Sequence, residues 1–485
     1  ALGANTTGAE NIAIGKGALD ANTTADSNIG IGNNALGVNT TGTANVAVGA
    51  AALDANTTAD NNTGIGYDAL SANTTGSENV GVGAYAMASN TTGADNTAIG
   101  TAALDANTTG SYNAAIGRHA LGVNTTGEEN VAVGYSALDA NTTGVSNVAM
   151  GSGALGANVA GDQSTAVGTN ALFTQNPSGN ADMNNVAVGY HALRLNTTGA
   201  ENTAVGANAL DANTTASGNS AFGKDSLTTN TTGSSNAAYG SNSLKLNTTG
   251  GSNVAIGISA LQANTTASNN TAVGKSALLA NTTGSYNTSI GYNSMDANTT
   301  GTENAAGGWN ALGANTTGSY NTAFGGGSLD ANTTASNNTA FGFKALTENT
   351  TGGANTAVGT SALDACTTGS NNTAIGKDAL TAVTTASNTT AIGFAAGAAL
   401  TTGSENTAIG FQALDAATTS NSNTAIGFTS MTTMTSGSNN VAVGTNSLHS
   451  ATSSTNCVAV GLNALLTTTT GSNNTAVGKS ALTAN

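Results

Sequence analysis

The chain has 485 residues, of which only 7% are charged and 4% are aromatic, and its formal net charge is −16. Such a dilute negative charge supports solubility and argues against nucleic-acid binding. No apolar run reaches the length of about 18 residues that a membrane-spanning helix needs, so no membrane span is expected in this segment.

Glycine recurs every 17 residues from Gly15 to Gly168 and, after a slip of four residues, from Gly189 to Gly478. A period this short and regular predicts a solenoid in which each repeat is one coil. We expect an all-β parallel β-solenoid, or β-roll, of about 28 coils that forms one continuous rod. The coils cover 1–172 and 185–485. The slip, which carries the only proline, predicts an inserted loop at 173–184, either a tolerated insertion or a bump on which a partner docks.

One repeat reads N-T-A-V-G-x-x-A-L-x-A-N-T-T-G-S-x, and we number its positions 1 to 17 in that order. Val, Ile and Thr at positions 2 and 4 predict a strand over positions 2–4, and we expect a second strand near positions 8–12. The frequent Gly and Asn, and the lack of a 3.6-residue apolar stripe, argue against helix. Position 5 is always Gly, which predicts a turn with positive φ or a close backbone approach.

The two faces of the first strand carry different side chains. Position 4 is large and apolar in nearly every repeat, so positions 2 and 4 are expected to face the interior. Position 3 would then face outward, yet it is almost always Ala, and its members include Ala13, Ala47, Ala204, Ala357 and Ala476. We interpret this column as a lateral interface between chains, which fits a homotrimer. In the alternative interpretation, position 3 lies inside a cramped single-chain coil.

Position 6 varies widely, which indicates a solvated turn. The aromatic residues that we single out there are Tyr67, Tyr135, Tyr190, Tyr292 and Trp309. They are expected to bind weakly to sugars of a cell-surface or glycan receptor. A catalyst needs convergent polar groups in a concave pocket, whereas a repeat places side chains in columns on a flank. We therefore expect no enzymatic activity, no catalytic residue, no cofactor and no metal site.

Positions 9 and 12 are expected to be sheltered. Leu at position 9 completes the core, and position 12 is Asn as far as Asn349, apart from Gln175 at the slip. Stacked amides can donate hydrogen bonds from one coil to the next. From Cys366 onward this column is mostly apolar, so the Asn-Thr-Thr triplets are expected to be structural although they match the N-glycosylation pattern. Cys366 and Cys457 are too far apart along the rod for a disulfide.

The strings Asn185-Val-Ala-Val-Gly189, Asn253-Val-Ala-Ile-Gly257 and Asn440-Val-Ala-Val-Gly444 resemble the core motif of YadA-like trimeric autotransporter adhesin heads. This resemblance implies a left-handed parallel β-roll that assembles as a trimer. The longer pattern NTAIGxxAL followed by NTTGSxN is similar to repeat arrays of phage-type tail fibres and bacterial surface proteins.

These observations favour a structural shaft of an extracellular, cell-surface or virion fibre, which holds a binding tip away from its base and adheres along its flank. The alternatives are a bacterial surface adhesin or filament subunit and an ice-binding solenoid. Against ice binding, the adjacent Thr57 and Thr58 are expected to point to opposite sides. Because the sequence begins and ends within a repeat, we expect a segment of a longer protein.

Overall fold

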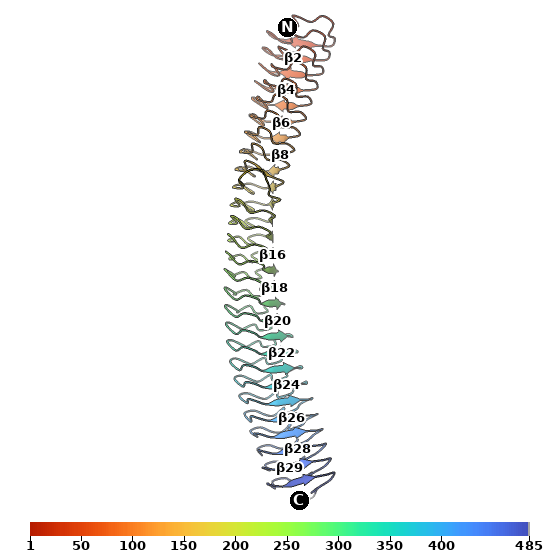
Figure 1. The fold of residues 1–485 in the computed structure, drawn as a ribbon, viewed down its shortest axis with the longest axis vertical. Coiled ribbons are helices and arrows are strands. Elements are labelled where there is room, and N and C mark those ends of the chain that lie inside the picture. Colours follow the sequence, from red (N-terminus) through yellow and green to blue (C-terminus); the bar gives the residue numbers. More distant parts are fainter. Residues whose placement is uncertain (484–485) are drawn as a thin grey trace. The chain divides into compact units, whose positions relative to one another are not determined.

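The computed structural model describes residues 1–483, and none of these residues is helical. The chain is an all-β parallel β-solenoid with a 17-residue repeat (Figure 1). It divides into two compact units. Unit 1 comprises Ala1–Asn242 with Leu246–Thr249, and unit 2 comprises Ser243–Lys245 with the described residues from Gly250 onward.

The described residues form 28 three-residue strands, each over positions 2–4 of its coil, as the sequence predicts. In unit 1 these are β1 (Ile12–Ile14), β2 (Ile29–Ile31), β3 (Val46–Val48), β4 (Thr63–Ile65), β5 (Val80–Val82), β6 (Thr97–Ile99), β7 (Ala114–Ile116), β8 (Val131–Val133), β9 (Val148–Met150), β11 (Thr165–Val167), β13 (Val186–Val188), β14 (Thr203–Val205), β15 (Ser220–Phe222) and β16 (Ala237–Tyr239). In unit 2 they are β17 (Val254–Ile256), β18 (Thr271–Val273), β19 (Thr288–Ile290), β20 (Ala305–Gly307), β21 (Thr322–Phe324), β22 (Thr339–Phe341), β23 (Thr356–Val358), β24 (Thr373–Ile375), β25 (Thr390–Ile392), β26 (Thr407–Ile409), β27 (Thr424–Ile426), β28 (Val441–Val443), β29 (Val458–Val460) and β30 (Thr475–Val477).

Within each unit, consecutive strands pair in parallel and in exact repeat register. Ala204 is opposite Ala221 in unit 1, and Ala357 is opposite Ala374 in unit 2. Every column of the repeat therefore becomes a physical row of identical positions, one from each coil.

The prediction of a second strand near positions 8–12 is wrong, because those residues form turns. Residues at positions 7, 9 and 17 have positive φ in nearly every coil; Leu19 at position 9, for example, has φ 52°. A non-glycine residue in this left-handed region costs about 1 kcal/mol, and burial of the Leu side chain offsets that cost. The turns still bind the next coil, as when Leu19 N donates to Ala35 O at 3.0 Å.

Position 5 needs glycine for two reasons. Gly359, for example, has φ 134°, and a Cβ there would lie 2.6 Å from the carbonyl oxygen of Gly376 in the next coil. No L side chain tolerates both the conformation and the contact, so the expected turn with positive φ is confirmed.

The predicted orientation of the strand is wrong. Position 3 faces the interior: Ala47, Ala204 and Ala357 are fully buried within the single chain, Ala476 nearly so, and Ala13 is half-buried near the start of the chain. Positions 2 and 4 face outward and are partly or largely exposed. The interior is too narrow for larger side chains, since a Cβ on Gly30 at position 3 would already lie 3.2 Å from Leu19 Cγ.

The Ala column therefore offers no surface to a second chain, and the interpretation that placed an interface on it is corrected. The alternative, that position 3 lies inside a cramped single-chain coil, describes the structure. Position 3 packs against the leucines at position 9, which are buried as predicted.

Two rows of buried Asn side chains complete the interior. At position 12, Asn298 Nδ2 donates to Asn281 Oδ1 of the preceding coil at 2.8 Å and to Gly301 O at 3.1 Å. The predicted amide ladder is thereby confirmed. A second row at position 1, which the sequence analysis overlooked, is also buried; there Asn45 N donates to Asn28 Oδ1 at 3.0 Å.

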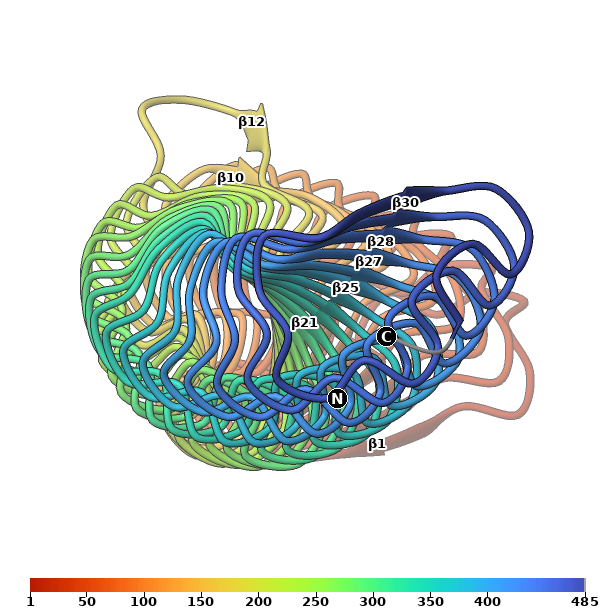
Figure 2. The same cartoon turned by 90° about the horizontal axis from the view of Figure 1, so that it is seen from below.

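The predicted loop at 173–184 lies in unit 1, and only its middle part leaves the coil (Figure 2). Gln175 is fully buried at position 12, where Asn185 Nδ2 donates to its Oε1 at 2.9 Å. Met183 is also buried. Between them, β12 (Ala181–Asp182) pairs in parallel with β10 (Gly161–Asp162) outside the main sheet. At the insertion the position 12 ladder is interrupted: Gln175 Nε2 donates to Asn158 Oδ1 at 3.4 Å, whereas Asn196 Nδ2 of the next coil donates to Gly199 O and not to Gln175.

The orientation of the strand can be tested with two adjacent residues. We expect Ala204→Glu to prevent folding of unit 1, because it places a carboxylate in a dry interior without a partner. Val205→Glu, on the outward side, should retain the fold. Circular dichroism and protease resistance measure both, and a well-folded Ala204→Glu chain would contradict the orientation.

The amide ladder predicts a position-dependent loss of stability. Asn298→Ala leaves Asn281 Oδ1 without a donor and should lower the free energy of unfolding by about 1–3 kcal/mol. Cys366→Ala is the matched control in the same column, where Sγ makes only a 3.6 Å contact with Gly369 O. Urea denaturation should show the larger loss for Asn298→Ala, and equal losses would count against a stabilising ladder.

Candidate functional site

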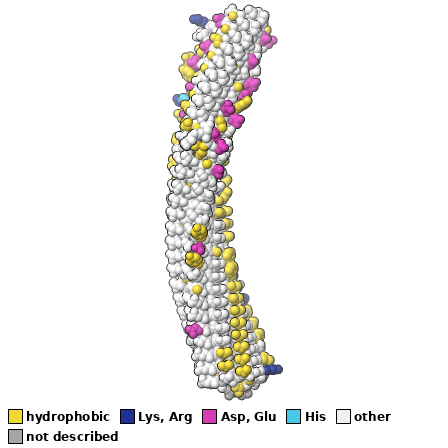
Figure 3. Space-filling view, viewed as in Figure 1, with side chains coloured by type: hydrophobic (Ala, Val, Ile, Leu, Met, Phe, Trp, Pro, Cys, Tyr) yellow, Lys and Arg dark blue, Asp and Glu magenta, His cyan; other side chains and the backbone are white. Residues whose placement is uncertain are grey.

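The outward side chains of the strands form a continuous surface in each unit, and the strands of unit 2 fan out from β21 to β30 (Figure 2). Position 2 is mostly Thr or Val, and position 4 is Val, Ile, Met, Phe or Tyr in every strand except β20, where it is Gly307. Position 6 follows at the carboxyl end of each strand. We call the row of position 4 and position 6 side chains of a unit its apolar strip. In unit 2, hydrophobic side chains line one edge of the molecule, visible in the lower half of Figure 3.

The apolar strip of unit 2 contains stacked aromatic rings that the sequence analysis did not single out. Phe394, Phe411 and Phe428 occupy position 6 in consecutive coils, with ring centroids 5.4 and 5.2 Å apart and nearly parallel planes. At position 4, Phe324 and Phe341 stack at 5.4 Å. Three successive aromatic residues in one column are a signal that the sequence itself contains. The sequence-based prediction considered only isolated aromatic residues at position 6 and therefore missed this one.

The predicted position 6 aromatics are exposed but are not brought together. The exposed fraction exceeds half for each of Tyr67, Tyr135, Tyr190, Tyr292 and Trp309. Their neighbours differ: the ring of Tyr85 meets Tyr67 edge-on at 5.4 Å, and Lys275 Nζ lies 5.8 Å from the ring centroid of Tyr292. These residues are separate surface features and do not form one site.

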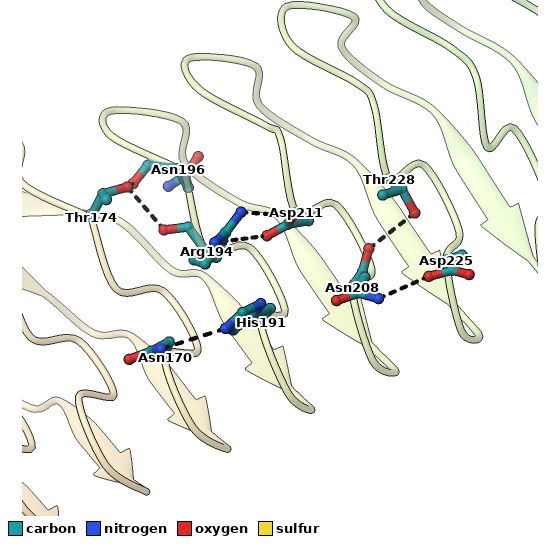
Figure 4. A network of polar contacts seen from close by, with 9 residues as sticks. All are labelled: Asn170, Thr174, His191, Arg194, Asn196, Asn208, Asp211, Asp225 and Thr228. Carbon is teal, nitrogen blue, oxygen red and sulfur yellow. Dashed lines mark hydrogen bonds and ion pairs between the residues drawn. The ribbon is translucent and has the colours of Figure 1, made fainter.

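Polar side chains of unit 1 interact from coil to coil along positions 7 and 10 (Figure 4). Arg194 binds Asp211 of the next coil through two hydrogen bonds, from Nε to Oδ1 at 2.9 Å and from Nη2 to Oδ2 at 3.1 Å. Asn208 Nδ2 donates to Asp225 Oδ1 at 3.0 Å. Each of these contacts joins adjacent coils, so the network strengthens the stack.

His191 is the histidine in this network. Its Nε2 lies 3.4 Å from Asn170 Nδ2, and its ring stacks on Tyr190. Burial, and then the charge of Arg194, lower the pKa of His191. In this arrangement the imidazole nitrogen faces the side-chain amide of Asn170.

Metal clusters, membrane-spanning helices and reactive thiols are further kinds of candidate site in the described part of the chain. Within residues 1–483, no three His, Cys, Asp or Glu side chains lie together in a way that could hold a metal ion, and no helix is long and apolar enough to cross a bilayer. Cys366 and Cys457 are both buried free thiols, and burial raises the pKa of Cys366 to about 11. A thiol with so high a pKa is a weak nucleophile at neutral pH.

No protein-family model and no curated protein sequence matches this chain. The resemblance to trimeric adhesin heads therefore rests on the quoted motifs. A β-solenoid is compatible with many functions, so any function has to be argued from the surface.

Several carboxylates at position 10 are partly buried. Burial raises the pKa of Asp54, Asp105, Asp296, Asp330 and Asp415 above the ordinary Asp value of 3.8. A raised pKa means that the folded chain holds these protons more tightly than the unfolded chain. Their protonation therefore stabilises the fold as the pH falls, and this contribution is lost as the pH rises through the raised values.

We accordingly expect the melting temperature to rise when the pH is lowered from neutral to about pH 4, close to the ordinary Asp pKa. In the triple variant Asp54→Asn, Asp105→Asn, Asp330→Asn the melting temperature at neutral pH should be higher and its pH dependence weaker. Scanning calorimetry of both proteins across this range measures the effect. A melting temperature that falls steadily with acidification, equally in both proteins, would contradict the proposed role of burial.

Proposed function

We propose that this chain is a structural shaft of an extracellular, cell-surface or virion fibre, built by association of identical chains through the apolar strip. The observation that carries the proposal is the direction of the strand side chains: the small Ala residues fill the interior, while Val, Ile and Phe are left outside. Large contiguous apolar surfaces are rare on monomeric proteins and mark interaction sites.

A second copy of the chain is the partner that this surface fits best. The strip repeats every coil, so two copies present matching rows in register, as identical surfaces in symmetric assemblies do. Position 4 carries no charged residue in any coil, and most of the 25 acidic residues lie in unit 1, whereas position 6 of unit 2 carries three lysines, Lys275, Lys377 and Lys479. The position 4 row of unit 2 is therefore the part of the strip most easily removed from water. The resemblance to trimeric adhesin heads sets the expected number of chains at three.

A shaft function also agrees with the way the interior is built. Buried amides, backbone carbonyls and small side chains repeat from coil to coil, and each coil binds its neighbours through the same contacts. A repeat built in this way extends by addition of coils without a new core. A bacterial surface adhesin or filament subunit remains the alternative biological setting, since it uses the same assembly.

Charges placed on the strip test the proposal. Ile392→Lys and Phe411→Lys should each shift the sedimentation mass of the wild-type assembly towards that of a single chain, because an interface would have to bury an unpaired ammonium group. Thr402→Lys, at the exposed position 14 away from the strip, is the control and should leave the mass unchanged. A monomeric wild-type protein would refute the proposal, as would an assembly insensitive to both strip variants.

Ice binding is a second candidate, favoured by a Thr row different from the Thr57–Thr58 pair considered above. Position 2 faces outward on the sheet, and it is Thr in seven consecutive coils of unit 2, at Thr322, Thr339, Thr356, Thr373, Thr390, Thr407 and Thr424. Regularly spaced hydroxyl and methyl groups on a sheet can order water. Thermal hysteresis in the purified protein would support this function, and its absence would exclude it.

A further inference from the structure

Strand β20 makes a notch in the sheet surface of unit 2. Its outward residues are Ala305 at position 2 and Gly307 at position 4, whereas the preceding strand has Thr288 and Ile290 there. Part of the missing volume is filled from the next coil, because a Cβ on Gly307 would lie 2.5 Å from Cδ1 of the Phe324 ring. The other half of the notch, over the outward face of Ala305 at position 2, stays open.

The open half is a depression of about 480 Å³, lined by Tyr286, Thr288, Glu303, Asn304 and Ala305. Its volume lies within the range of small-molecule sites. Tyr286 and Glu303 come from position 17 of consecutive coils, at the amino end of the strands. The depression therefore lies on the opposite margin of the sheet surface from position 6.

Glu303 lacks a hydrogen bond that three of the other five glutamates in its column make, and Glu78 and Glu201 also lack this bond. Glu10, Glu129 and Glu405 each accept a hydrogen bond from a Ser hydroxyl in the next coil, at 3.3, 3.0 and 3.0 Å. The neighbours of Glu303 at position 17 are instead Tyr286 and Tyr320. Among residues 1–483, no hydrogen bond to the Glu303 carboxylate or from the Thr288 hydroxyl is formed.

Asn304, the other polar residue that lines the depression, already uses its side-chain amide in hydrogen bonds within the fold. Asn304 Nδ2 donates to Gly318 O at 2.9 Å and its Oδ1 accepts from Asn321 N at 2.9 Å. The groups left for a ligand are thus one exposed phenol ring, one carboxylate and one hydroxyl, around an alanine floor.

We propose that this depression binds one uncharged sugar ring of a glycan. An aromatic face packs against the apolar C–H face of a sugar, while a carboxylate accepts hydrogen bonds from two neighbouring sugar hydroxyls. The Thr288 hydroxyl can donate or accept at the same ring. An anionic ligand is disfavoured because the only charged lining residue is Glu303. This site differs from the position 6 aromatics and does not depend on the proposed self-association.

The test uses the whole chain on an array of neutral oligosaccharides that end in glucose, galactose or N-acetylglucosamine, followed by titration calorimetry with the best binder. Glu303→Gln and Tyr286→Ser should each weaken binding about tenfold or more, because each removes one of the two main contacts. Ala305→Val, which installs a residue common at position 2, should crowd the floor of the depression and weaken binding. Glu405→Gln is the matched control and should bind as the wild type does.

Circular dichroism of each variant establishes that the fold is intact. The proposal is overturned if the wild type binds no neutral glycan, if it binds choline in place of sugars, or if Ala305→Val binds normally. Sugar binding that is lost instead on replacing Tyr292 and Trp309 by Ser would assign it to position 6. Ile392→Lys should still bind sugar even where it disrupts assembly, so failure of the shaft proposal and failure of the glycan proposal give different results.

Discussion

The buried asparagine amides are the interaction on which the rest of the structure depends. In one coil, Asn28 and Asn39 approach the same carbonyl oxygen, that of Gly42, and both donate to it at 2.9 Å. Asn39 Nδ2 also donates to Asn22 Oδ1 of the preceding coil. A chain that turns back every few residues buries many polar backbone groups that no sheet ladder can satisfy, and these amides supply the missing donors and acceptors. They close each coil and join it to the next.

The same interaction explains where the repeat changes character. The position 12 ladder ends at Asn349, whose Oδ1 is buried without a hydrogen-bond partner because the next residue in the column is Cys366. Beyond it the column is filled by residues such as Val383, Leu400 and Met434, all fully buried. Apolar packing replaces amide bonding there, while the strand row and the position 1 row continue. The coil therefore tolerates either chemistry at position 12, provided that the side chain fills the space and leaves few groups unpaired.

A narrow interior has a consequence for function. In most proteins the bulky apolar residues of a strand fill the core, but here the backbone walls of the coil lie too close together for them. Val, Ile and Phe at position 4 are displaced to the outside, where they form a regular apolar surface. Features that interrupt the regularity, such as the Phe394–Phe411–Phe428 stack and the notch at β20, are the places where one coil differs from its neighbours. On a repeat surface, such differences are what a specific partner can recognise.

The sequence by itself determined the period, the strand at positions 2–4, the glycine turn at position 5, the buried Leu at position 9 and the amide ladder at position 12. Each follows from residue types that recur at fixed spacing, which is local information. Which strand face is inside was decided only by the tertiary structure. Alternation along a strand defines two faces but does not say which of them lies inside. That choice depends on the distance between the strand and the position 9 leucines, such as Leu19, across the coil. The left-handed conformations at positions 7, 9 and 17, and the unpaired Glu303 beside its notch, likewise depend on contacts between coils, which a single repeat does not contain.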